Sequence, residues 1–184
     1  MTHLQFPLRS AFIALPLEGA VKQRFYALQE ELKPFEDFLR FQHPDSPHLT
    51  LYYWPTVLKI EYDAMIPQVA KIAERTSPFT LQINGVDTFG KAGDERVLFL
   101  TVAFSPELAT LKKLCPWPNP PDQPFHPHIT VARISHSQKF AVHRKQVMKV
   151  FNGFGESFSA EGIRLYAEVE GRKQTPLHTF AFGV

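Results

Sequence analysis

Two short strings of the chain hold the side-chain types that proton transfer and phosphate binding need. Residues 47–51 read Pro-His-Leu-Thr-Leu and residues 127–131 read Pro-His-Ile-Thr-Val, eighty positions further along. In an extended strand, successive side chains point to opposite faces, so a His and a Thr two positions apart share one face. An imidazole exchanges protons near neutral pH, and a hydroxyl can donate a hydrogen bond to a phosphate oxygen. Each string therefore offers one imidazole and one hydroxyl to the same side of a sheet.

Two such strands side by side would gather His48, Thr50, His128 and Thr130 around one space. One imidazole would then take a proton from water while the other gives a proton to a leaving oxygen, and the hydroxyls would hold the phosphate. This combination predicts a phosphodiesterase. We favour His48 as the acid and His128 as the base, although the near-symmetry of the strings leaves the reverse assignment open. Chance alone gives about half an occurrence of His-x-Thr in a chain of this composition, so the prediction depends on the matched pair.

The paired strings resemble the signature of the 2H phosphoesterase family. Residues 124–133 (Pro-Phe-His-Pro-His-Ile-Thr-Val-Ala-Arg) are similar to the second-motif region of its bacterial RNA 2′,3′-cyclic phosphodiesterase branch, also called 2′-5′ RNA ligase-like. The opening residues 10–15, the string 96–100 and the end 175–180 also resemble that branch. The sequence departs from it at Ala167, because the branch usually has a Ser shortly after the preceding Leu-Tyr pair.

The resemblance implies an α+β fold in which two pseudo-symmetric lobes of mostly antiparallel sheet, with outer helices, flank a central cleft. It implies metal-independent hydrolysis of 2′,3′-cyclic phosphate ends of RNA or nucleotides to 2′-phosphomonoesters, without a cofactor, and the reverse reaction as 2′-5′ RNA ligation. His48 and His128 would be catalytic, and Thr50 and Thr130 would bind the phosphate. Arg133 matches a position at which the branch has an arginine that contacts phosphate.

The order of predicted elements also favours two similar lobes. Apolar residues at positions 21, 25, 28 and 32 predict a helix that ends at Pro34, and a second helix is predicted over 63–75 with Pro67 in its first turn. Strands are predicted over 9–16, 38–41, 48–54, 79–83, 96–104, 157–168 and 177–183, with the second motif as a further strand. A turn is predicted at Asn84-Gly85, helices after Ser105 and over 139–150, and a proline-rich segment without helix over 116–127. One motif falls in each half, so we expect the two motifs to face each other across the cleft.

Composition and charge are those of an ordinary globular protein. The 184 residues fit a single bilobal domain over residues 1–184, and the net charge of +2 is too small to predict a general nucleic-acid binder. Cys115 is the only cysteine, so no internal disulfide can form, and no apolar run is long enough to span a membrane. We therefore expect a cytoplasmic monomer without a membrane partner, whose substrates are RNA ends or nucleotides that carry a 2′,3′-cyclic phosphate.

Other interpretations use the same residues. His126 and His128 share a strand face and could bind a metal ion, but no Cys, Asp or Glu stands at a useful spacing. We therefore predict no metal site and expect His126 to line the pocket or to stack on a base. The chain could also be a nucleotide or RNA-end binding module without significant turnover, or a phosphodiesterase of small cyclic nucleotides.

Strict alternation assigns faces to the residues after each motif. It places Arg133 on the face opposite His128, unless the strand bulges first. Tyr53 and Trp54 could stack on a nucleobase, or pack in the core as strand aromatics usually do. Alternation places Tyr53 away from His48, whereas Tyr52 and Trp54 would share the face of His48. Phe12 is expected in the hydrophobic core, with the floor of the cleft as the alternative.

Overall fold

The computed structural model describes residues 4–119 and 124–183, which form nine strands and four α-helices. The strands are β1 (Leu8–Pro16), β2 (Leu39–Phe41), β3 (His48–Val57), β4 (Phe79–Lys91), β5 (Asp94–Val102), β6 (His128–Ile134), β7 (Glu156–Ala160), β8 (Gly162–Val169) and β9 (Arg172–Ala181). The helices are α1 (Gly19–Leu32), α2 (Lys59–Glu74), α3 (Pro106–Leu114) and α4 (Ser137–Val150), and a 3₁₀ turn, η1 (Lys33–Phe35), follows α1. Residues 120–123 of the predicted proline-rich segment lie outside the described residues, and its described residues contain no helix, as predicted.

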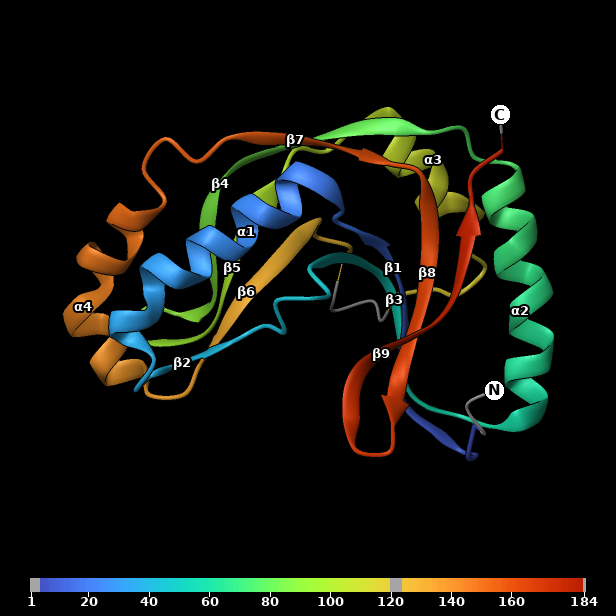
Figure 1. The fold of residues 1–184 in the computed structure, drawn as a ribbon, viewed down its shortest axis with the longest axis horizontal. Helices are drawn as coiled ribbons and strands as arrows, with labels where there is room; N and C mark the ends of the chain where they lie inside the picture. The colour runs from blue at the N-terminus through green and yellow to red at the C-terminus, as the bar shows by residue number, and fades with distance from the viewer. Residues whose placement is uncertain (1–3, 120–123, 184) are drawn as a thin grey trace.

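All strand pairs are antiparallel and form one curled sheet with two lobes (Figure 1). One lobe contains β7, β4, β5, β6 and β2, and the other contains β3, β1, β8 and β9. The two motif strands, β3 and β6, join the lobes through the single residue pair Leu49 and Ile129. Helices α1 and α4 lie with the first lobe and α2 with the second (Figure 1). The predicted fold class is confirmed.

The two lobes do not correspond to the two halves of the sequence. Helix α1 follows β1 of the second lobe, yet it packs on α4 and β7 of the first. Helix α3 follows β5 of the first lobe, yet its Lys112 donates a hydrogen bond to the Leu51 carbonyl of β3. Strands β8 and β9 return from the second half of the chain to pair with β1. Each lobe therefore mixes elements of both halves of the sequence.

Helix α1 shows how the sequence specifies an outer helix. Val21, Phe25, Leu28 and Leu32 lie on one face and are all buried. The helix ends where Pro34, which has no backbone N–H, enters the 3₁₀ turn. Its buried face also contains Gln29, a polar residue that is only 5% exposed.

Three local predictions were wrong. Pro67 lies in the middle of α2 rather than in its first turn, because the helix already begins at Lys59, where the Glu61 carboxylate accepts a hydrogen bond from the Leu58 N–H. Asn84-Gly85 is not a turn: β4 continues through it with a bulge, and Asn84 accepts a hydrogen bond from the Thr101 hydroxyl. The strand predicted over 157–168 is two strands, β7 and β8, which pair with different lobes.

The hydrophobic core lies between the sheet and the four helices, and a second, smaller cluster lies apart from it. This second cluster consists of Phe12, Ala14 and Tyr166. Phe12 was predicted in the main core; it is indeed buried, at 6% exposed, but its ring belongs to the separate cluster. Within the described residues, no helix combines the length and the apolar character that a bilayer crossing requires.

Candidate active site

The register of the two motif strands brings all four predicted residues into one array. Leu49 is paired with Ile129, and both are fully buried on the core side of the sheet. In an antiparallel pair this register sets His48 opposite Thr130 and Thr50 opposite His128, all on the other face. Directly opposite residues have Cβ atoms about 4.5–5.5 Å apart. The two imidazoles therefore occupy opposite corners of a small four-residue array, with the two hydroxyls at the remaining corners.

His48 lies on an aromatic bed. Its ring stacks on Phe12 at 4.6 Å between centroids, and the Tyr166 ring lies 5.4 Å away. Phe12 and Tyr166 also stack on each other at 4.8 Å, so the small cluster forms the floor of the site beneath His48. Burial of the imidazole, which is 9% exposed, and to a smaller extent the charge of His128 together lower its pKa from 6.5 to about 4. In the free protein at neutral pH the ring is therefore uncharged.

His128 has an equivalent bed in the other lobe. The Phe89 and Phe99 rings meet the imidazole in edge-to-face contacts at 4.9 and 5.3 Å. Phe89 and Phe99 stack on each other at 4.0 Å. Burial lowers the pKa of His128 as well, and the nearby His126 lowers it further. Neither bed has a local signal in the sequence, because the members come from four separate strands, β1, β8, β4 and β5.

The backbone fixes the orientation of both imidazoles in the same way. Nδ1 of His48 lies 2.6 Å from the Ser46 carbonyl, and Nδ1 of His128 lies 2.7 Å from the His126 carbonyl. A carbonyl oxygen can only accept a hydrogen bond, so Nδ1 of each ring donates and must carry the hydrogen. Nε2 is then the atom that remains for chemistry: it accepts a proton when the ring is neutral and donates one when the ring is charged.

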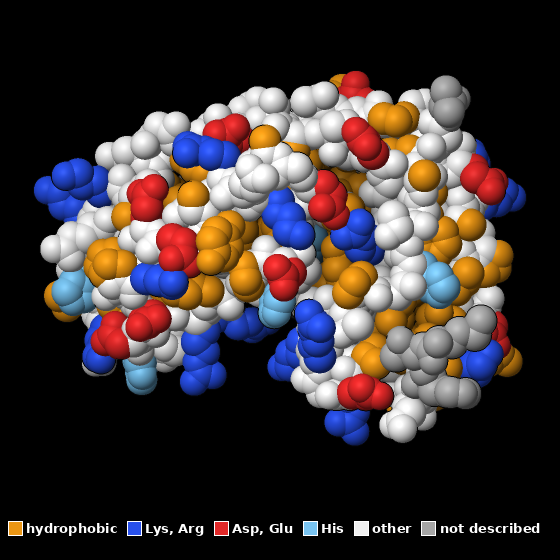
Figure 2. All heavy atoms as spheres, in the orientation of Figure 1, with side chains coloured by type: hydrophobic (Ala, Val, Ile, Leu, Met, Phe, Trp, Pro, Cys, Tyr) orange, Lys and Arg blue, Asp and Glu red, His pale blue; other side chains and the backbone are white. Residues whose placement is uncertain are grey.

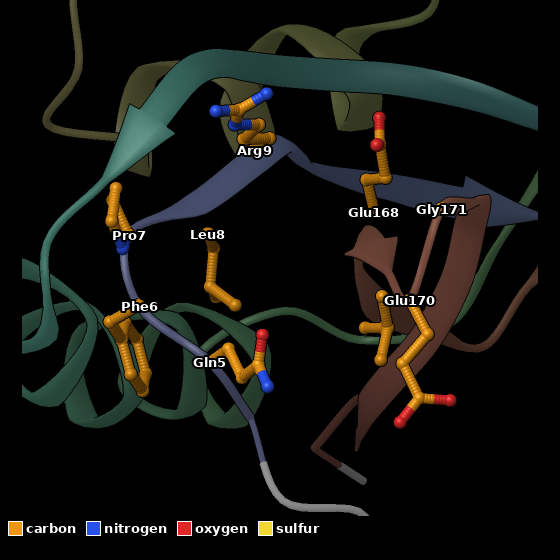
Figure 3. A pocket seen from close by; sticks show the side chains of 9 residues that line it. Gln5, Phe6, Pro7, Leu8, Arg9, Glu168, Glu170 and Gly171 are labelled. Carbon is orange, nitrogen blue, oxygen red and sulfur yellow. The ribbon is translucent and has the colours of Figure 1, made fainter.

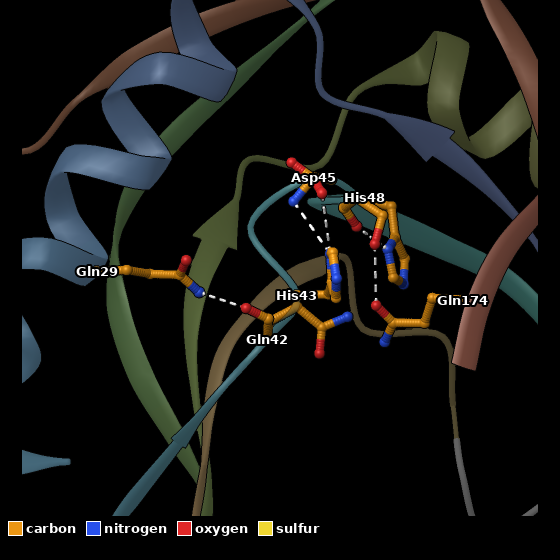
Figure 4. Close-up of polar contacts among 7 residues, drawn as sticks. Gln29, Gln42, His43, Asp45, His48 and Gln174 are labelled. Carbon is orange, nitrogen blue, oxygen red and sulfur yellow. Dashed lines mark hydrogen bonds and ion pairs between the residues drawn. The ribbon is translucent and has the colours of Figure 1, made fainter. Parts of the chain in front are cut away.

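The β8–β9 hairpin supports the first motif. The Ser46 hydroxyl donates a hydrogen bond of 3.0 Å to the Gln174 side-chain oxygen, next to the carbonyl that holds His48 (Figure 4). Gln174 adopts a left-handed backbone conformation with φ of +58°, which non-glycine residues rarely occupy. Neither Ser46 nor Gln174 was predicted from the sequence, because the two residues are 128 positions apart in the chain.

A β-bulge in each motif strand changes the faces of the residues that follow. In β6, Thr130 pairs with Phe99 and Ala132 with Leu98, so Val131 is the extra residue. Val131 and Ala132 are both fully buried, and Arg133 returns to the face of His128, where it is exposed. Strict alternation therefore assigned Arg133 to the wrong face. The reason is the bulge at Val131, the exception under which Arg133 would share the face of His128.

The equivalent bulge in β3 reverses the prediction for the aromatic residues. Ala14 pairs with Thr50 and Ile13 with Tyr52, which makes Leu51 the extra residue. Tyr53 consequently stands opposite Phe12 on the face of His48, and it is 50% exposed. Tyr52 and Trp54, which were expected there, instead pack with Trp117 at 5.8 and 4.9 Å between ring centroids.

The carbonyl of each extra residue is bound by a side chain from a helix. Nζ of Lys112 in α3 donates to the Leu51 carbonyl at 2.6 Å. Nε2 of Gln29 in α1 donates to the Val131 carbonyl at 3.3 Å. It also donates to the Gln42 carbonyl at 2.8 Å (Figure 4). A bulge leaves backbone groups outside the regular ladder, so these contacts stabilise the irregular backbone on which Tyr53 and Arg133 stand.

His126 lies beside the array rather than in it. Its ring is exposed, lies 6.3 Å from the His128 ring and meets the Phe89 ring edge at 5.4 Å. Over residues 4–119 and 124–183, no three His, Cys, Asp or Glu side chains gather closely enough to hold a metal ion. The orphan polar atom near the array is the Tyr166 hydroxyl, which is buried and has no hydrogen-bond partner among the described residues.

A separate pocket of about 360 Å³ lies at the far end of β1 (Figure 3). It is lined by Gln5 to Arg9 and by Glu168 to Gly171 and contains none of the motif residues. His48 pairs with Pro16, seven residues from Arg9, so the pocket lies about 23 Å along the strand from the array. The pocket is therefore distinct from the four-residue array, which we take as the candidate active site.

Known proteins share both the sequence pattern and the fold of this chain. A family model described as the 2′-5′ RNA ligase superfamily matches residues 21–172. An RNA 2′,3′-cyclic phosphodiesterase of Geobacillus stearothermophilus is 27% identical over 128 residues, which are 66% of this chain but only 41% of that protein's length.

Two solved structures have a similar fold. A protein of Thermus thermophilus has a TM-score of 0.72 and 21% identity, over 94% of this chain and 97% of its own. E. coli LigT complexed with 3′-AMP has a TM-score of 0.66 and 22% identity, over 96% of this chain and 98% of its own. The resemblance seen in the sequence is thus confirmed, and because the family model covers most of its length, the chain belongs to the 2′-5′ RNA ligase superfamily.

Proposed function

We propose that this protein hydrolyses 2′,3′-cyclic phosphate ends of RNA or nucleotides to 2′-phosphomonoesters. The observation that carries the proposal is the four-residue array, in which two imidazoles with free Nε2 atoms stand diagonally across two hydroxyls. Family membership and the name of the Geobacillus relative support the same chemistry.

The array suits an in-line displacement at phosphorus. Thr50 and Thr130 donate hydrogen bonds to the non-bridging oxygens and stabilise the charge that develops on them. One Nε2 takes a proton from water as the water oxygen bonds to phosphorus, and the other Nε2 gives a proton to the ribose 3′ oxygen as its bond to phosphorus breaks. The attacking and leaving oxygens must lie on opposite sides of the phosphorus, which is where the diagonal arrangement sets the two rings.

Arg133 and His126 complete the proposed substrate site. Arg133 stands on the same face, beyond Thr130, and binds a phosphate group with its guanidinium. His126 lies exposed beside His128 and lines the cleft next to the substrate. If an RNA 5′-hydroxyl replaces water as the nucleophile, the same groups form a 2′-5′ bond. We place this activity in the cytoplasm and assign it to a monomer without a bound cofactor or membrane partner.

The test is product analysis on 2′,3′-cyclic-ended RNA and on 2′,3′-cyclic mononucleotides. His48→Asn and His128→Asn should each lower the rate by about 10²–10⁴-fold, because each removes a proton-transfer group. Asn retains an N–H near the position of Nδ1, so the bond to the backbone carbonyl can persist. Thr50→Val and Thr130→Val should have smaller effects, since one hydroxyl remains to hold the phosphate.

His136→Asn is the matched control, because His136 is exposed just before α4 and its side chain makes no cap hydrogen bond. Circular dichroism of each variant checks that the fold is kept. Near-wild-type turnover by either motif variant would rule out the two-histidine mechanism. Absence of turnover by the wild-type protein, with nucleotide binding intact, would favour the binding module.

The pH–rate profile assigns the two roles. It should be bell-shaped, because one imidazole must be neutral and the other charged. The variant that lacks the base loses the acidic limb, and the variant that lacks the acid loses the basic limb. In the free protein the lowered pKa of His48 favours its neutral form, which is the form a base needs.

A further inference from the structure

Two arginines stand directly opposite each other at the edge of the candidate site. Arg40 of β2 pairs with Arg133 of β6 in the antiparallel register, between the pairs Leu39–Ile134 and Phe41–Ala132. Both arginines are exposed, whereas Leu39 and Ile134 are buried on the core side. Like charges directly across a strand pair repel and weaken the sheet, so this pair requires an explanation beyond the stability of the fold.

No carboxylate compensates either charge within the described residues. Four of the other seven arginines have such a partner, among them Arg24 with Glu156 and Arg164 with Glu18, whereas Arg9, Arg75 and Arg172 have none within the described residues. Neither Arg40 nor Arg133 takes part in an ion pair over residues 4–119 and 124–183. Two uncompensated arginines at directly opposite positions can form a site for an anion with several oxygens, because each guanidinium can donate two parallel hydrogen bonds.

The pair lies on the face of the catalytic array. The bulge at Val131 returns Arg133 to the side of His128 and Thr130, and Arg40 shares that face because it is directly opposite. Two regular strand positions and the bulged Val131 lead from Thr130 to Arg133. The two residues are therefore about 7 Å apart along the strand. Figure 2 shows the molecule hollowed between its two lobes, with Lys and Arg side chains on both rims of the hollow.

The backbone that presents the two arginines is firmly held. Gln29 donates to the carbonyls of Gln42 and Val131, and the Gln42 N–H donates to the Val131 carbonyl at 2.9 Å. At the other end of β2, the Ser135 N–H donates to the Phe38 carbonyl at 2.9 Å. The backbone that carries both arginines is thus held in place by hydrogen bonds, next to the four-residue array.

We infer that Arg40, together with Arg133, forms a second phosphate subsite that binds the phosphate on the 5′ side of the nucleotide whose 2′,3′-cyclic phosphate reacts. The inference rests on the proposed function and specifies its substrate class: an RNA end or a 5′-phosphorylated nucleotide, rather than a cyclic nucleotide with one phosphate. In such a nucleotide the ribose lies between the two phosphate groups. Likewise, about 7 Å of strand β6 lies between Thr130 and the arginine pair. The exposed Tyr53, on the other lobe, faces the same cleft without adding charge.

The kinetic test compares two substrates that differ in one phosphate: adenosine 2′,3′-cyclic phosphate and its 5′-phosphorylated form. Arg40→Gln should lower kcat/KM for the 5′-phosphorylated substrate about 10–100-fold, mainly through KM, because a charge-assisted contact is lost. It should change kcat/KM for the substrate without the 5′-phosphate by less than about twofold. Arg40→Lys, which keeps the charge but not the bidentate geometry, should fall between.

Lys145→Gln is the matched control, because Lys145 is an exposed cation on the outer helix α4 and its loss should affect neither substrate. Arg40→Gln should fold at least as stably as the wild type, since it removes repulsion from Arg133. Equal losses on both substrates would overturn the subsite, because Arg40 would then act on the reacting phosphate or on the fold. Unchanged kinetics on both would overturn it too.

A binding measurement decides the subsite independently of turnover. Titration calorimetry compares adenosine 2′-monophosphate with adenosine 2′,5′-bisphosphate on the wild type and on Arg40→Gln. The wild type should bind the bisphosphate at least about tenfold more tightly, and Arg40→Gln should lose this preference. No preference in the wild type would refute the subsite, whereas absence of cyclic phosphate hydrolysis with the preference intact would refute only the proposed function.

Discussion

His48 and His128 share one hydrogen-bond arrangement but differ in burial. Each ring donates from Nδ1 to the carbonyl two residues earlier in the chain, which leaves Nε2 for the substrate. His48 is 9% exposed on its bed of Phe12 and Tyr166, whereas His128 is only partly buried. At the scale of residues, the consequence is that the charge of His48 is coupled to the stability of the fold.

The unfolding free energy should therefore depend on pH through His48. Its folded-state pKa of about 4 is below the ordinary 6.5, so between these values the unfolded chain binds a proton that the folded protein does not. The contribution of neutral His48 to the unfolding free energy is fully present above pH 6.5 and is lost as the pH falls towards 4. At about 1.4 kcal/mol per pKa unit, the loss is on the order of 3 kcal/mol. Urea unfolding at several pH values between 7.5 and 4 measures it.

His48→Asn should flatten this pH dependence, because Asn does not titrate, and His136→Asn should leave it as in the wild type. Burial of His128 acts in the same direction, so a weaker slope should remain in His48→Asn. Identical slopes in His48→Asn and the wild type would show that His48 is not protonated differently in the two states.

Chelation should leave turnover unchanged. The proposed mechanism uses two imidazoles and two hydroxyls and requires no Lewis acid, so dialysis against EDTA should preserve the rate on cyclic phosphate. A rate that falls on chelation and returns with added zinc would instead favour His126 and His128 as metal ligands.

At the scale of elements, a bulge in each motif strand determines which side chains enter the cleft. Leu51 and Val131 occupy equivalent positions, three residues after their motif histidines. Their carbonyls are bound by Lys112 and Gln29, one from each of two helices that cross to the opposite lobe. Because of these bulges, Tyr53 lies on the face of His48 and Arg133 lies on the face of His128.

Gln29→Leu should weaken both the fold and the substrate site. It removes two hydrogen bonds and leaves the partly buried Gln42 carbonyl without this donor, which should lower the unfolding free energy by about 1–3 kcal/mol. KM should rise, because the strand that positions Arg133 is held less firmly. Urea unfolding and steady-state kinetics measure the two effects. Gln23→Leu, on an exposed face of the same helix, should show neither; wild-type stability in Gln29→Leu would contradict the proposed role.

At the scale of the whole molecule, the exchange of elements between the lobes links them. Helix α1 leaves one lobe to pack on the other, and β8 and β9 return to pair with β1. Neither half of the sequence contains a complete lobe, so neither can bury its hydrophobic face without the other. The four-residue array, with one histidine from each lobe, forms only when both lobes are present.

We expect the two lobes to unfold in a single transition. Trp54 and Trp117 are in contact at 4.9 Å between ring centroids and lie at the lobe that contains β3, so tryptophan fluorescence reports on that lobe. Far-ultraviolet circular dichroism reports on the helices of both lobes. The two signals should give the same urea midpoint if unfolding is cooperative. A fluorescence transition clearly separate from the circular dichroism transition would show two independent units.

The sequence by itself determined the chemistry of the site. His48, Thr50, His128 and Thr130 are placed on one face by strand alternation, which is a local rule that requires no knowledge of neighbouring strands. The apolar spacing of α1 and the Ser105 cap of α3, whose hydroxyl accepts a hydrogen bond from the Leu108 N–H, are local in the same sense and were predicted correctly.

Only the tertiary structure decided what surrounds those four residues. A bulge depends on the partner strand, so alternation assigned Arg133 and Tyr53 to the wrong face. The aromatic beds, the contact of Gln174 with Ser46 and the pairing of Arg40 with Arg133 join residues far apart in the chain, for which a sequence pattern has no local signal. The physical reason is that proton-transfer groups are a property of residue type, whereas their burial, pKa and neighbours are set by long-range packing.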